Sequence, residues 1–171
     1  TSGDGPIKNW SGTPKNAREA LKAFNPDKVI SYEMKKYHCY SCGLGCGGVL
    51  DIKTVGNGEY AETHKAEYET IEAFGALLLN NDLDSVLIIN EMLNRAGMDS
   101  ISAGGTVAYA IEAYENGIIT REQIDGLELT WGNTAAIVEL VRKMIDREGI
   151  GDILADGSKK AASVLGGSEY A

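Results

Sequence analysis

The chain has 171 residues, an apolar fraction of 43% and a formal net charge of −9, and this length is enough for one domain with a sizeable core or for two small ones. The negative charge disfavours nucleic acid as a partner, because a protein that binds it gains affinity by neutralising phosphates with Lys and Arg. No run of 18 or more apolar residues is present and no charged-then-apolar leader opens the sequence, so we expect neither a membrane span nor a secretion signal.

The N-terminal part begins with a polar, glycine-rich stretch over 1–13, which is typical of a loop. Thr13 then precedes Pro14, and an N-cap residue followed by proline at the first helical position predicts the start of a helix. This helix should end before Pro26, because a proline disfavours helical geometry in the residue that precedes it. The next segment, 29–38, is ambiguous between strand and helix.

A small β-hairpin is predicted over about 47–65. Residues 48–55 alternate between apolar and polar, and Asn57-Gly58 follows them. An Asn-Gly pair is a strong signal for a tight turn between two strands.

From Glu67 onward the hydrophobic period is helical. Asp82 is the expected N-cap of one helix, Gly97 the left-handed residue after its end, and Asp99 the start of the next. Thr120 and Gln123 form a short capping box. The predicted helices cover 68–79, 82–97, 99–117, 133–149 and 151–166, the last two each closed by glycine. The predicted fold class is therefore mainly α, a single helical domain over 1–171 with one small β-hairpin next to a cysteine loop.

All three cysteines fall in one glycine-rich segment, with the spacing C-x2-C-x3-C at Cys39, Cys42 and Cys46. An odd number of cysteines in a tight cluster argues against a disulfide framework and for metal ligation in a reducing compartment, so we expect a cytoplasmic protein. Thiolates at this spacing can reach one metal centre, and glycines allow positive φ and close approach of backbone N–H groups to the sulfurs. The glycines of the segment are Gly43, Gly45, Gly47 and Gly48.

Two kinds of metal site fit this pattern. A [4Fe–4S] cluster takes four protein ligands, usually cysteines, so the fourth would lie outside this sequence. A structural zinc site would take Cys3His, with His38 or His64 as the nitrogen ligand, in a non-catalytic zinc-stabilised helical interaction domain. His38 adjoins Cys39, which makes joint ligation awkward. Structural zinc sites usually show two ligand pairs and this chain has one, which favours the cluster.

Longer motifs follow the cysteine loop in order: "AEYETIEAFG", "NEMLNRAGMDSISAGGTVAYAIEAYENGIIT", "DGLELTWGN" and "REGIGDILADGSKKAA". Together they resemble the tungsten-containing aldehyde ferredoxin oxidoreductase family over nearly the whole chain. The resemblance implies a three-domain protein, in which a β-rich base carries a bis-pterin tungsten cofactor and two helical domains close over it. This chain looks like the second domain, an excerpt of a longer multidomain oxidoreductase, and the fourth cysteine would come from the third domain.

The resemblance also places individual residues. The family's pterin-contacting motif D-x-x-G-L-D matches the segment that contains Asn94, Gly97 and Asp99. Asn94 replaces a carboxylate, so it would accept bonds from the pterin with less charge assistance. In "AEYET" the resemblance places Glu69 near the tungsten, as a catalytic carboxylate that handles protons or orients substrate, with Glu67 as its near neighbour.

The implied reaction converts a small-molecule aldehyde and water into a carboxylate at tungsten or molybdenum, and electrons leave singly through the [4Fe–4S] cluster to ferredoxin. Reductive activation of an aromatic ring is a related chemistry of the same family. Residues 88–92 lack the E-x-x-H pattern of an intersubunit metal site, so no such site is expected. Without the base domain and the fourth cysteine, we expect the excerpt alone to be inert.

Each of these residues also has an ordinary structural interpretation. Gly97 is typical of a helix C-terminus and Asp99 of an N-cap. Glu69 in the first turn of a helix is favourable through the helix dipole alone. Gly104 and Gly105 lie inside a predicted helix, where close packing against another helix is the simplest explanation.

Overall fold

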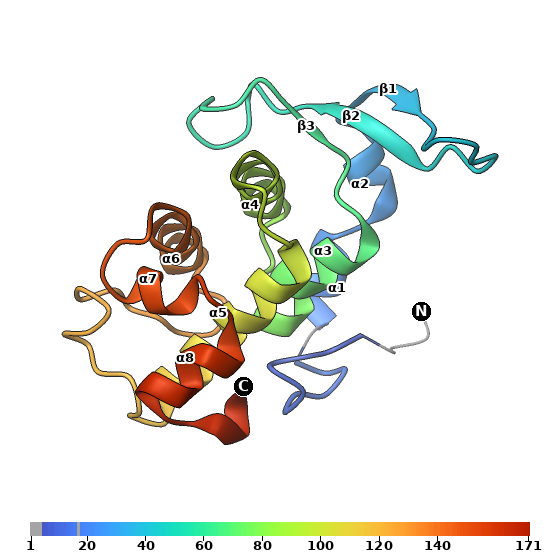
Figure 1. Cartoon of the computed structure of the whole chain (residues 1–171). Helices are drawn as coiled ribbons and strands as arrows, with labels where there is room; N and C mark the ends of the chain where they lie inside the picture. Colours follow the sequence, from blue (N-terminus) through green and yellow to red (C-terminus); the bar gives the residue numbers. More distant parts are fainter. Residues whose placement is uncertain (1–4, 17) are drawn as a thin grey trace.

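The computed structural model describes residues 5–16 and 18–171 as an irregular N-terminal segment, a small antiparallel sheet and a group of helices (Figure 1). The sheet lies at one end of the molecule and the C-terminal helices lie at the other. The prediction of a mainly α fold with a small β element is confirmed.

The first helix begins later than predicted. Helix α1 covers Arg18–Ala23, because Thr13 does not cap a helix: its N–H and its hydroxyl both donate to the side-chain oxygen of Asn16, at 2.9 and 2.7 Å. The helix ends before Pro26, as predicted. The proline then opens helix α2 (Pro26–Ile30) at its first position.

The predicted hairpin is confirmed and gains a third strand. Strands β2 (Gly47–Asp51) and β3 (Glu62–His64) pair antiparallel, joined by a longer connection that contains Asn57-Gly58. The ambiguous segment supplies strand β1 (Glu33–Tyr37), which pairs antiparallel with β2. The strand order is β1-β2-β3, so β1 is an edge strand and the cysteine loop connects it to the central strand.

The segment predicted as one helix over 68–79 is broken. Helix α3 covers Tyr68–Phe74, and a short 3-10 helix, η1, covers Ala76–Leu78. Gly75 separates them with φ −104° and ψ −96°. A Cβ at this glycine would clash with the carbonyl oxygen of Ile71, so the break depends on a residue without a side chain.

The two central helices begin and end where the sequence predicts. Helix α4 (Leu83–Ala96) starts after Asp82, whose carboxylate accepts from the N–H of Asp84 at 3.1 Å, and it ends at Gly97 with φ 68°. Helix α5 (Ser100–Glu115) starts after Asp99.

The C-terminal part differs from the prediction in its breaks. Helix α6 covers Thr134–Asp146 and ends on Arg147 with φ 54°, not on a glycine. The predicted last helix is two, α7 (Ile150–Leu154) and α8 (Ser158–Leu165), followed by the 3-10 helix η2 (Ser168–Tyr170). The capping box at 120–123 forms its reciprocal bonds, but a series of turns follows it instead of a helix.

The main core lies among α3 to α8, with α5 at its centre and Phe74 and Tyr109 fully buried. A smaller core lies between the sheet and α4, around Leu50, Ile52 and Leu87. Helices α3 and α5 pack closely at Gly104, where a Cβ would lie 2.7 Å from the Cβ of Ala73. In the described part of the chain, the helices are too short or too polar to cross a bilayer.

Candidate functional site

The three cysteines lie in the loop between β1 and β2. A turn closes the first half of this loop, because the N–H of Cys42 donates to the carbonyl oxygen of Cys39 at 3.0 Å. Cys39 and Cys46 are exposed and Cys42 is half-buried, and all three are free thiols. Two of the three cysteines therefore lie open to solvent.

The side chain of His38 contacts two points of this loop. Its Nδ1 lies 3.1 Å from the carbonyl oxygen of Cys42. Its ring also lies against Gly45, which has φ 61° and where a Cβ would clash with the imidazole. The other zinc-ligand candidate, His64, lies outside the loop on β3 and contacts a tyrosine instead.

The cysteine loop is anchored to the sheet by a contact that crosses a strand. The hydroxyl of Tyr37, the last residue of β1, lies 2.9 Å from Nδ1 of His64 on β3. The rings meet edge to face, with centroids 5.4 Å apart. The Tyr37 ring passes over Gly47 of β2, where a Cβ would lie only 2.5 Å from the ring. Burial, followed by the charges of Cys39 and Glu67, raises the pKa of Tyr37, and its hydroxyl shares a hydrogen bond with the His64 ring.

A second contact also crosses the central strand β2, and it too passes over a glycine. The carboxylate of Glu33 on β1 accepts from Nζ of Lys65, just after β3, at 2.7 Å. The Glu33 side chain passes over Gly48, where a Cβ would lie 2.6 Å from a carboxylate oxygen of Glu33. Gly47 and Gly48 therefore belong to the strand and let the outer strands meet across it. Neither has positive φ, whereas Gly45 does, so the expected role in turning the loop is wrong for this pair.

A polar pocket of about 460 Å³ opens beside the anchored end of the loop. It lies where the starts of α3 and α5 approach α4 and β3. The hydroxyls of Thr70 on α3 and Ser100 on α5 are 2.7 Å apart and join the two helix starts. The buried amide of Asn90 donates to Thr63 and to the carbonyl oxygen of His64. The pocket is lined by Tyr37, His64, Lys65, Glu67, Thr70, Asn90, Asn94 and Ser100.

The candidate pterin-contacting residues lie at the junction between α4 and α5. Asn94, exposed in the last turn of α4, lines the polar pocket. Gly97 is exposed, and a Cβ there would meet nothing within 4 Å, so its left-handed φ and not crowding requires a glycine. Asp99 lines a different cavity, of about 160 Å³, against α6 and the α7–α8 connection. The structure thus brings Asn94, but not Asp99, to the polar pocket.

Asp99 acts as the N-cap of α5. Its carboxylate accepts from the N–H of Ser102 at 2.7 Å. This backbone bond, together with the Ser102 side chain, lowers the pKa of Asp99. The side chain is otherwise exposed.

The two glutamates of the "AEYET" motif have different positions. Glu67 occupies the N-cap position of α3 and lines the polar pocket. Glu69 lies in the first turn of α3, with an exposed side chain that is not part of the pocket lining. Within this chain, Glu67 is therefore nearer to the pocket than the predicted catalytic residue.

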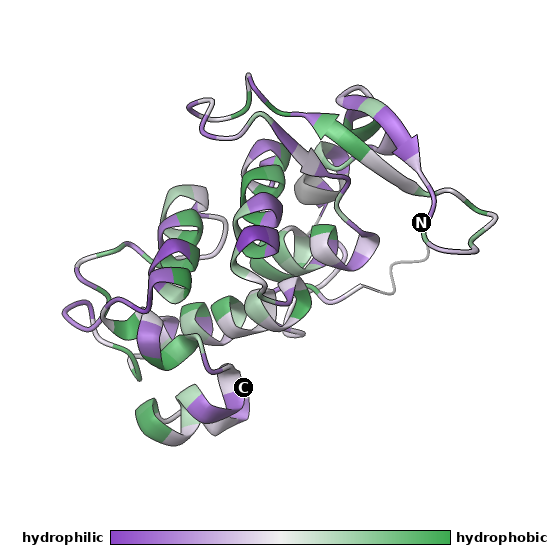
Figure 2. Ribbon diagram, turned by 45° about the horizontal axis from the view of Figure 1, so that its top comes forward, coloured by the Kyte–Doolittle hydropathy of each residue, from purple (hydrophilic) through white to green (hydrophobic). Residues whose placement is uncertain are grey.

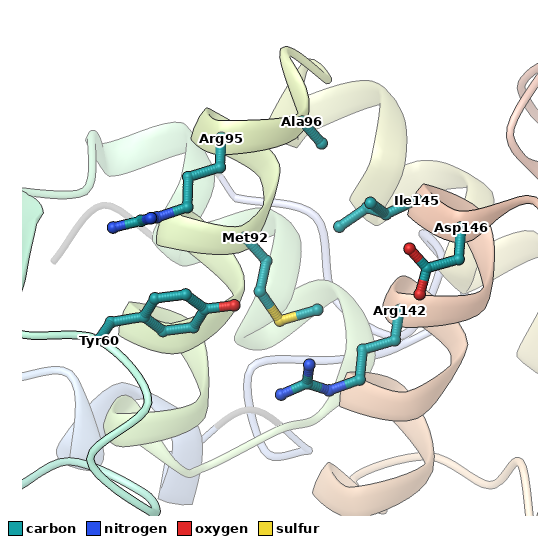
Figure 3. A pocket seen from close by; sticks show the side chains of 7 residues that line it. All are labelled: Tyr60, Met92, Arg95, Ala96, Arg142, Ile145 and Asp146. Carbon is teal, nitrogen blue, oxygen red and sulfur yellow. The ribbon is translucent and has the colours of Figure 1, made fainter.

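A further pocket, of about 270 Å³, lies between α4 and α6 and was not anticipated from the sequence (Figure 3). Arg95 lies over the ring of Tyr60, 5.1 Å from its centroid, and also pairs with the buried Glu91 at 2.6 Å. Arg142 forms a two-bond ion pair with Glu59. The Arg142–Glu59 ion pair and the contact of Arg95 with the Tyr60 ring hold the β2–β3 connection against α6 and α4. Arg142 and Glu59 lie 83 residues apart in sequence, so their pairing leaves no local signal.

In the ranges 5–16 and 18–171, no three or more His, Cys, Asp or Glu side chains are arranged to hold a single metal ion. The donor chemistry is nevertheless specific, because three thiols share one short loop and thiolates are the usual ligands of iron–sulfur clusters. The polar pocket offers amide, hydroxyl, ammonium and carboxylate groups together, a set that can both donate to and accept from a heterocycle.

Comparison with known proteins gives consistent matches. Two curated relatives, from Pyrococcus furiosus and Pyrococcus abyssi, are each named tungsten-containing aldehyde ferredoxin oxidoreductase. The first is 42% identical over 142 residues, which is 82% of this chain and 23% of the relative. The second is 40% identical over 145 residues, 83% of this chain and 23% of the relative. This chain thus spans about a quarter of the length of these relatives.

Among solved structures, the active site complex BamBC of benzoyl coenzyme A reductase, in complex with 1,5-dienoyl-CoA, is similar with a TM-score of 0.72 and 25% sequence identity. The match covers 97% of this chain and 24% of that chain. The family profile described as "Aldehyde ferredoxin oxidoreductase, domains 2 & 3" matches residues 1–171. The chain therefore belongs to the aldehyde ferredoxin oxidoreductase family.

Proposed function

We propose that this chain is the cluster- and pterin-contacting domain of a tungsten or molybdenum oxidoreductase that oxidises aldehydes to carboxylates with ferredoxin as the electron acceptor. An aldehyde and one water give a carboxylate, three protons and two electrons, and two one-electron carriers take up the electrons. The observation that carries the proposal is a loop of three free thiols beside a polar pocket, in a chain of this family.

Cys39, Cys42 and Cys46 would hold three irons of a [4Fe–4S] cluster, and a fourth cysteine would come from another part of the polypeptide. The free state of all three thiols, two of them on exposed residues, supports this assignment. His38 and Gly45 set the path of the loop between the thiols. A cluster here would supply a one-electron relay.

The tungsten–pterin group would supply the two-electron acceptor. Asn94, Gly97 and Asp99 are the residues of this chain proposed to contact the pterin. Asn94 and its neighbours in the polar pocket provide the hydrogen-bonding groups that a pterin edge needs. Asp99 already uses one interaction to cap α5, so its remaining acceptor capacity would serve the pterin contact.

Glu69 is proposed to take or deliver the proton as the carbonyl oxygen of the aldehyde changes charge. Its exposed position on this chain is compatible with a site completed by a neighbouring domain. A general acid or base of this kind typically contributes a factor of about 10² to 10⁴ in rate.

The structural similarity to benzoyl coenzyme A reductase supports a second candidate, reductive activation of an aromatic ring on the same scaffold. The 42% identity to a protein named aldehyde ferredoxin oxidoreductase, against 25% to the reductase, favours the aldehyde reaction. A zinc-stabilised interaction domain is the alternative of a different class.

The test uses the full-length protein, prepared without oxygen. We expect iron and sulfide in the ratio of a [4Fe–4S] cluster, tungsten or molybdenum with pterin, and ferredoxin reduction that depends on an aldehyde. Cys42→Ser should lose most of the iron, whereas Ser41→Ala, in the same turn, should keep it. Stoichiometric zinc with no iron would overturn the proposal in favour of the zinc domain. Reduction of an aromatic thioester without aldehyde oxidation would favour the second candidate.

A further inference from the structure

Asn90 is a buried polar residue in the middle of helix α4. Only 6% of its surface is exposed. Figure 2 shows that hydrophilic residues interrupt the hydrophobic ones along this helix. Burying an amide costs free energy unless its polar atoms have hydrogen-bond partners, so the partners of Asn90 indicate what the residue does.

Both N–H groups of the Asn90 side chain are used within this chain. Nδ2 donates to the hydroxyl of Thr63 at 3.0 Å and to the carbonyl oxygen of His64 at 2.8 Å. An amide nitrogen has two N–H groups, so neither is left for a ligand. The orientation of the amide is also fixed, because the carbonyl oxygen of His64 can only accept, and the reverse orientation would bring two oxygens together.

The amide oxygen of Asn90, in contrast, has no donor within 5–16 and 18–171. In that part of the chain, the hydrogen bonds of this side chain are the two that Nδ2 donates. Every fully buried side-chain oxygen or nitrogen there has a partner, so the Asn90 oxygen is not sealed inside the core. Because Asn90 lines the polar pocket of about 460 Å³, its oxygen opens into that pocket as a fixed acceptor.

Other groups of the pocket lining also favour a ligand that brings its own donors. Glu67 occupies the N-cap position of α3 without a capping bond from its side chain, and an ionised carboxylate can only accept. Nζ of Lys65 already pairs with Glu33 at 2.7 Å. A ligand edge with N–H groups therefore suits this part of the pocket better than an edge of oxygens.

We infer that Asn90 contacts the pterin directly, and that its Oδ1 accepts a hydrogen bond from an amino or ring N–H group of the pterin. This inference rests on the proposed function and adds to it a residue outside the segment that contains Asn94, Gly97 and Asp99. A pterin carries its N–H groups at fixed positions of a rigid heterocycle, so it can meet a fixed acceptor. A carboxylate or phosphate edge would place oxygen against oxygen, so Asn90 also selects the kind of edge that binds.

The same side chain ties α4 to β3, which is a purely structural role. Two kinds of substitution separate this role from ligand contact. Thr63→Val removes one partner on β3 and leaves the amide oxygen in place, because the bond to the carbonyl of His64 remains. Asn90→Leu removes the oxygen and keeps a side chain of similar size. Asn90→Ala also removes it, but leaves space for a water that can accept instead.

The experiment uses the full-length protein, prepared without oxygen, as the wild type, Asn90→Leu, Asn90→Ala and the matched control Thr63→Val. Each protein is incubated in urea at a concentration below its unfolding transition. The pterin that stays bound after gel filtration is quantified by fluorescence at successive times. The midpoint of urea unfolding is measured on the same samples.

We expect Asn90→Leu to release pterin about tenfold faster than the wild type, because an N–H group of the ligand then faces an apolar side chain. Asn90→Ala should be intermediate. Thr63→Val should release pterin at the wild-type rate, although its unfolding midpoint is lower. If Asn90→Leu does not fold, the comparison of Asn90→Ala with Thr63→Val decides in the same way.

Two results would overturn the contact and leave the proposed function intact. One is release at the wild-type rate from the Asn90 variants, which would mean that a donor from another domain meets the amide oxygen. The other is equally fast release from Thr63→Val, which would assign Asn90 to the fold alone. A wild-type protein without pterin would overturn both proposals.

Discussion

The hydroxyl of Tyr37 lies 2.9 Å from Nδ1 of His64, although the two residues belong to strands that do not pair with each other. The contact forms because Gly47, on the strand between them, has no side chain in the path of the tyrosine ring. The end of β1, from which the cysteine loop departs, is thereby fixed to the far side of the sheet.

Gly47→Ala should displace the Tyr37 ring and break its bond to His64. We expect a loss of about 1–3 kcal/mol in the free energy of unfolding, as is typical when a methyl group is forced into a well-packed site. Urea unfolding of the alanine variant measures this loss. Tyr37→Phe removes the hydrogen bond and keeps the ring, so it should cost about 1 kcal/mol. A Gly47→Ala variant as stable as the wild type would contradict the crossing contact.

Gly104 and Gly105 should respond in opposite ways to alanine. At Gly104 a Cβ would lie 2.7 Å from the Cβ of Ala73 and 2.8 Å from its carbonyl oxygen, so we expect a destabilisation of about 1–3 kcal/mol. At Gly105 nothing lies within 4 Å of a Cβ, so higher helix propensity should stabilise the protein by up to about 1 kcal/mol. Thermal unfolding of both variants measures the contrast, and similar effects at both positions would refute the close approach of α3 and α5.

Glu72→Gln should stabilise the protein at neutral pH. Glu72 lines an apolar groove of about 470 Å³ beside α2 and α3, and burial raises the pKa of its carboxyl above 4.5. Above the folded-state pKa the native protein holds a desolvated charge. As the pH falls through that pKa towards 4.5, the Glu72 carboxylate takes up a proton in the native state before it does so in the unfolded state. The loss of stability caused by the buried charge is then removed. The advantage of the glutamine variant should therefore shrink between neutral pH and pH 4.5, which denaturant unfolding at several pH values will measure.

Two substitutions at Asp99 should separate helix capping from cofactor contact. Asp99→Ala should cost about 1 kcal/mol of stability, whereas Asp99→Asn should cost little because asparagine is an equally good N-cap. If Asp99 also contacts the pterin, the asparagine variant of the full-length protein should retain less pterin at unchanged stability. Pterin released on denaturation, quantified by fluorescence, measures this. If the asparagine variant keeps its full pterin content, Asp99 serves only as the N-cap of α5 and does not contact the pterin.

Glu69 in the first turn of α3 and Glu67 at its N-cap can be compared directly in the full-length protein. Glu69→Gln should lower kcat for aldehyde oxidation by about 10² to 10⁴, the usual contribution of a general acid or base. Glu67→Gln, the matched variant at the N-cap position two residues earlier, should have the smaller effect on kcat. The reverse order would assign the proton-handling role to Glu67, which lines the polar pocket. Steady-state kinetics with saturating carrier distinguishes the two results.

The sequence predicted those elements that have a local signature. Asp82, Gly97 and Asp99 are found at the helix ends where capping preferences place them. The breaks at Gly75 and Gly157 were missed, because a glycine inside a helical pattern signals either packing or termination, and only tertiary contacts decide between them. Gly104 continues its helix whereas Gly75 ends one.

For the candidate site, the sequence identified the cysteine loop by its spacing and the α4–α5 junction by a motif. It did not identify the crossing contacts of Tyr37 and Glu33, which depend on strand order and on the missing side chains of Gly47 and Gly48. The glycines were interpreted as residues that turn the loop, and only Gly45 has the required φ. Long-range ion pairs such as Arg142 with Glu59 were likewise outside the reach of local patterns.

The hydroxyl pair of Thr70 and Ser100 limits how far α3 and α5 can move relative to each other. Thr70 follows Glu69 and Ser100 follows Asp99, and the hydroxyls of Thr70 and Ser100, 2.7 Å apart, join the starts of the two helices that carry these candidate residues. Helices α3 and α5 cannot slide apart without separating these hydroxyls and opening the contact at Gly104. We therefore expect members of this family that take bulkier molecules to make room by remodelling segments beyond this chain, leaving the spacing between these two helices the same.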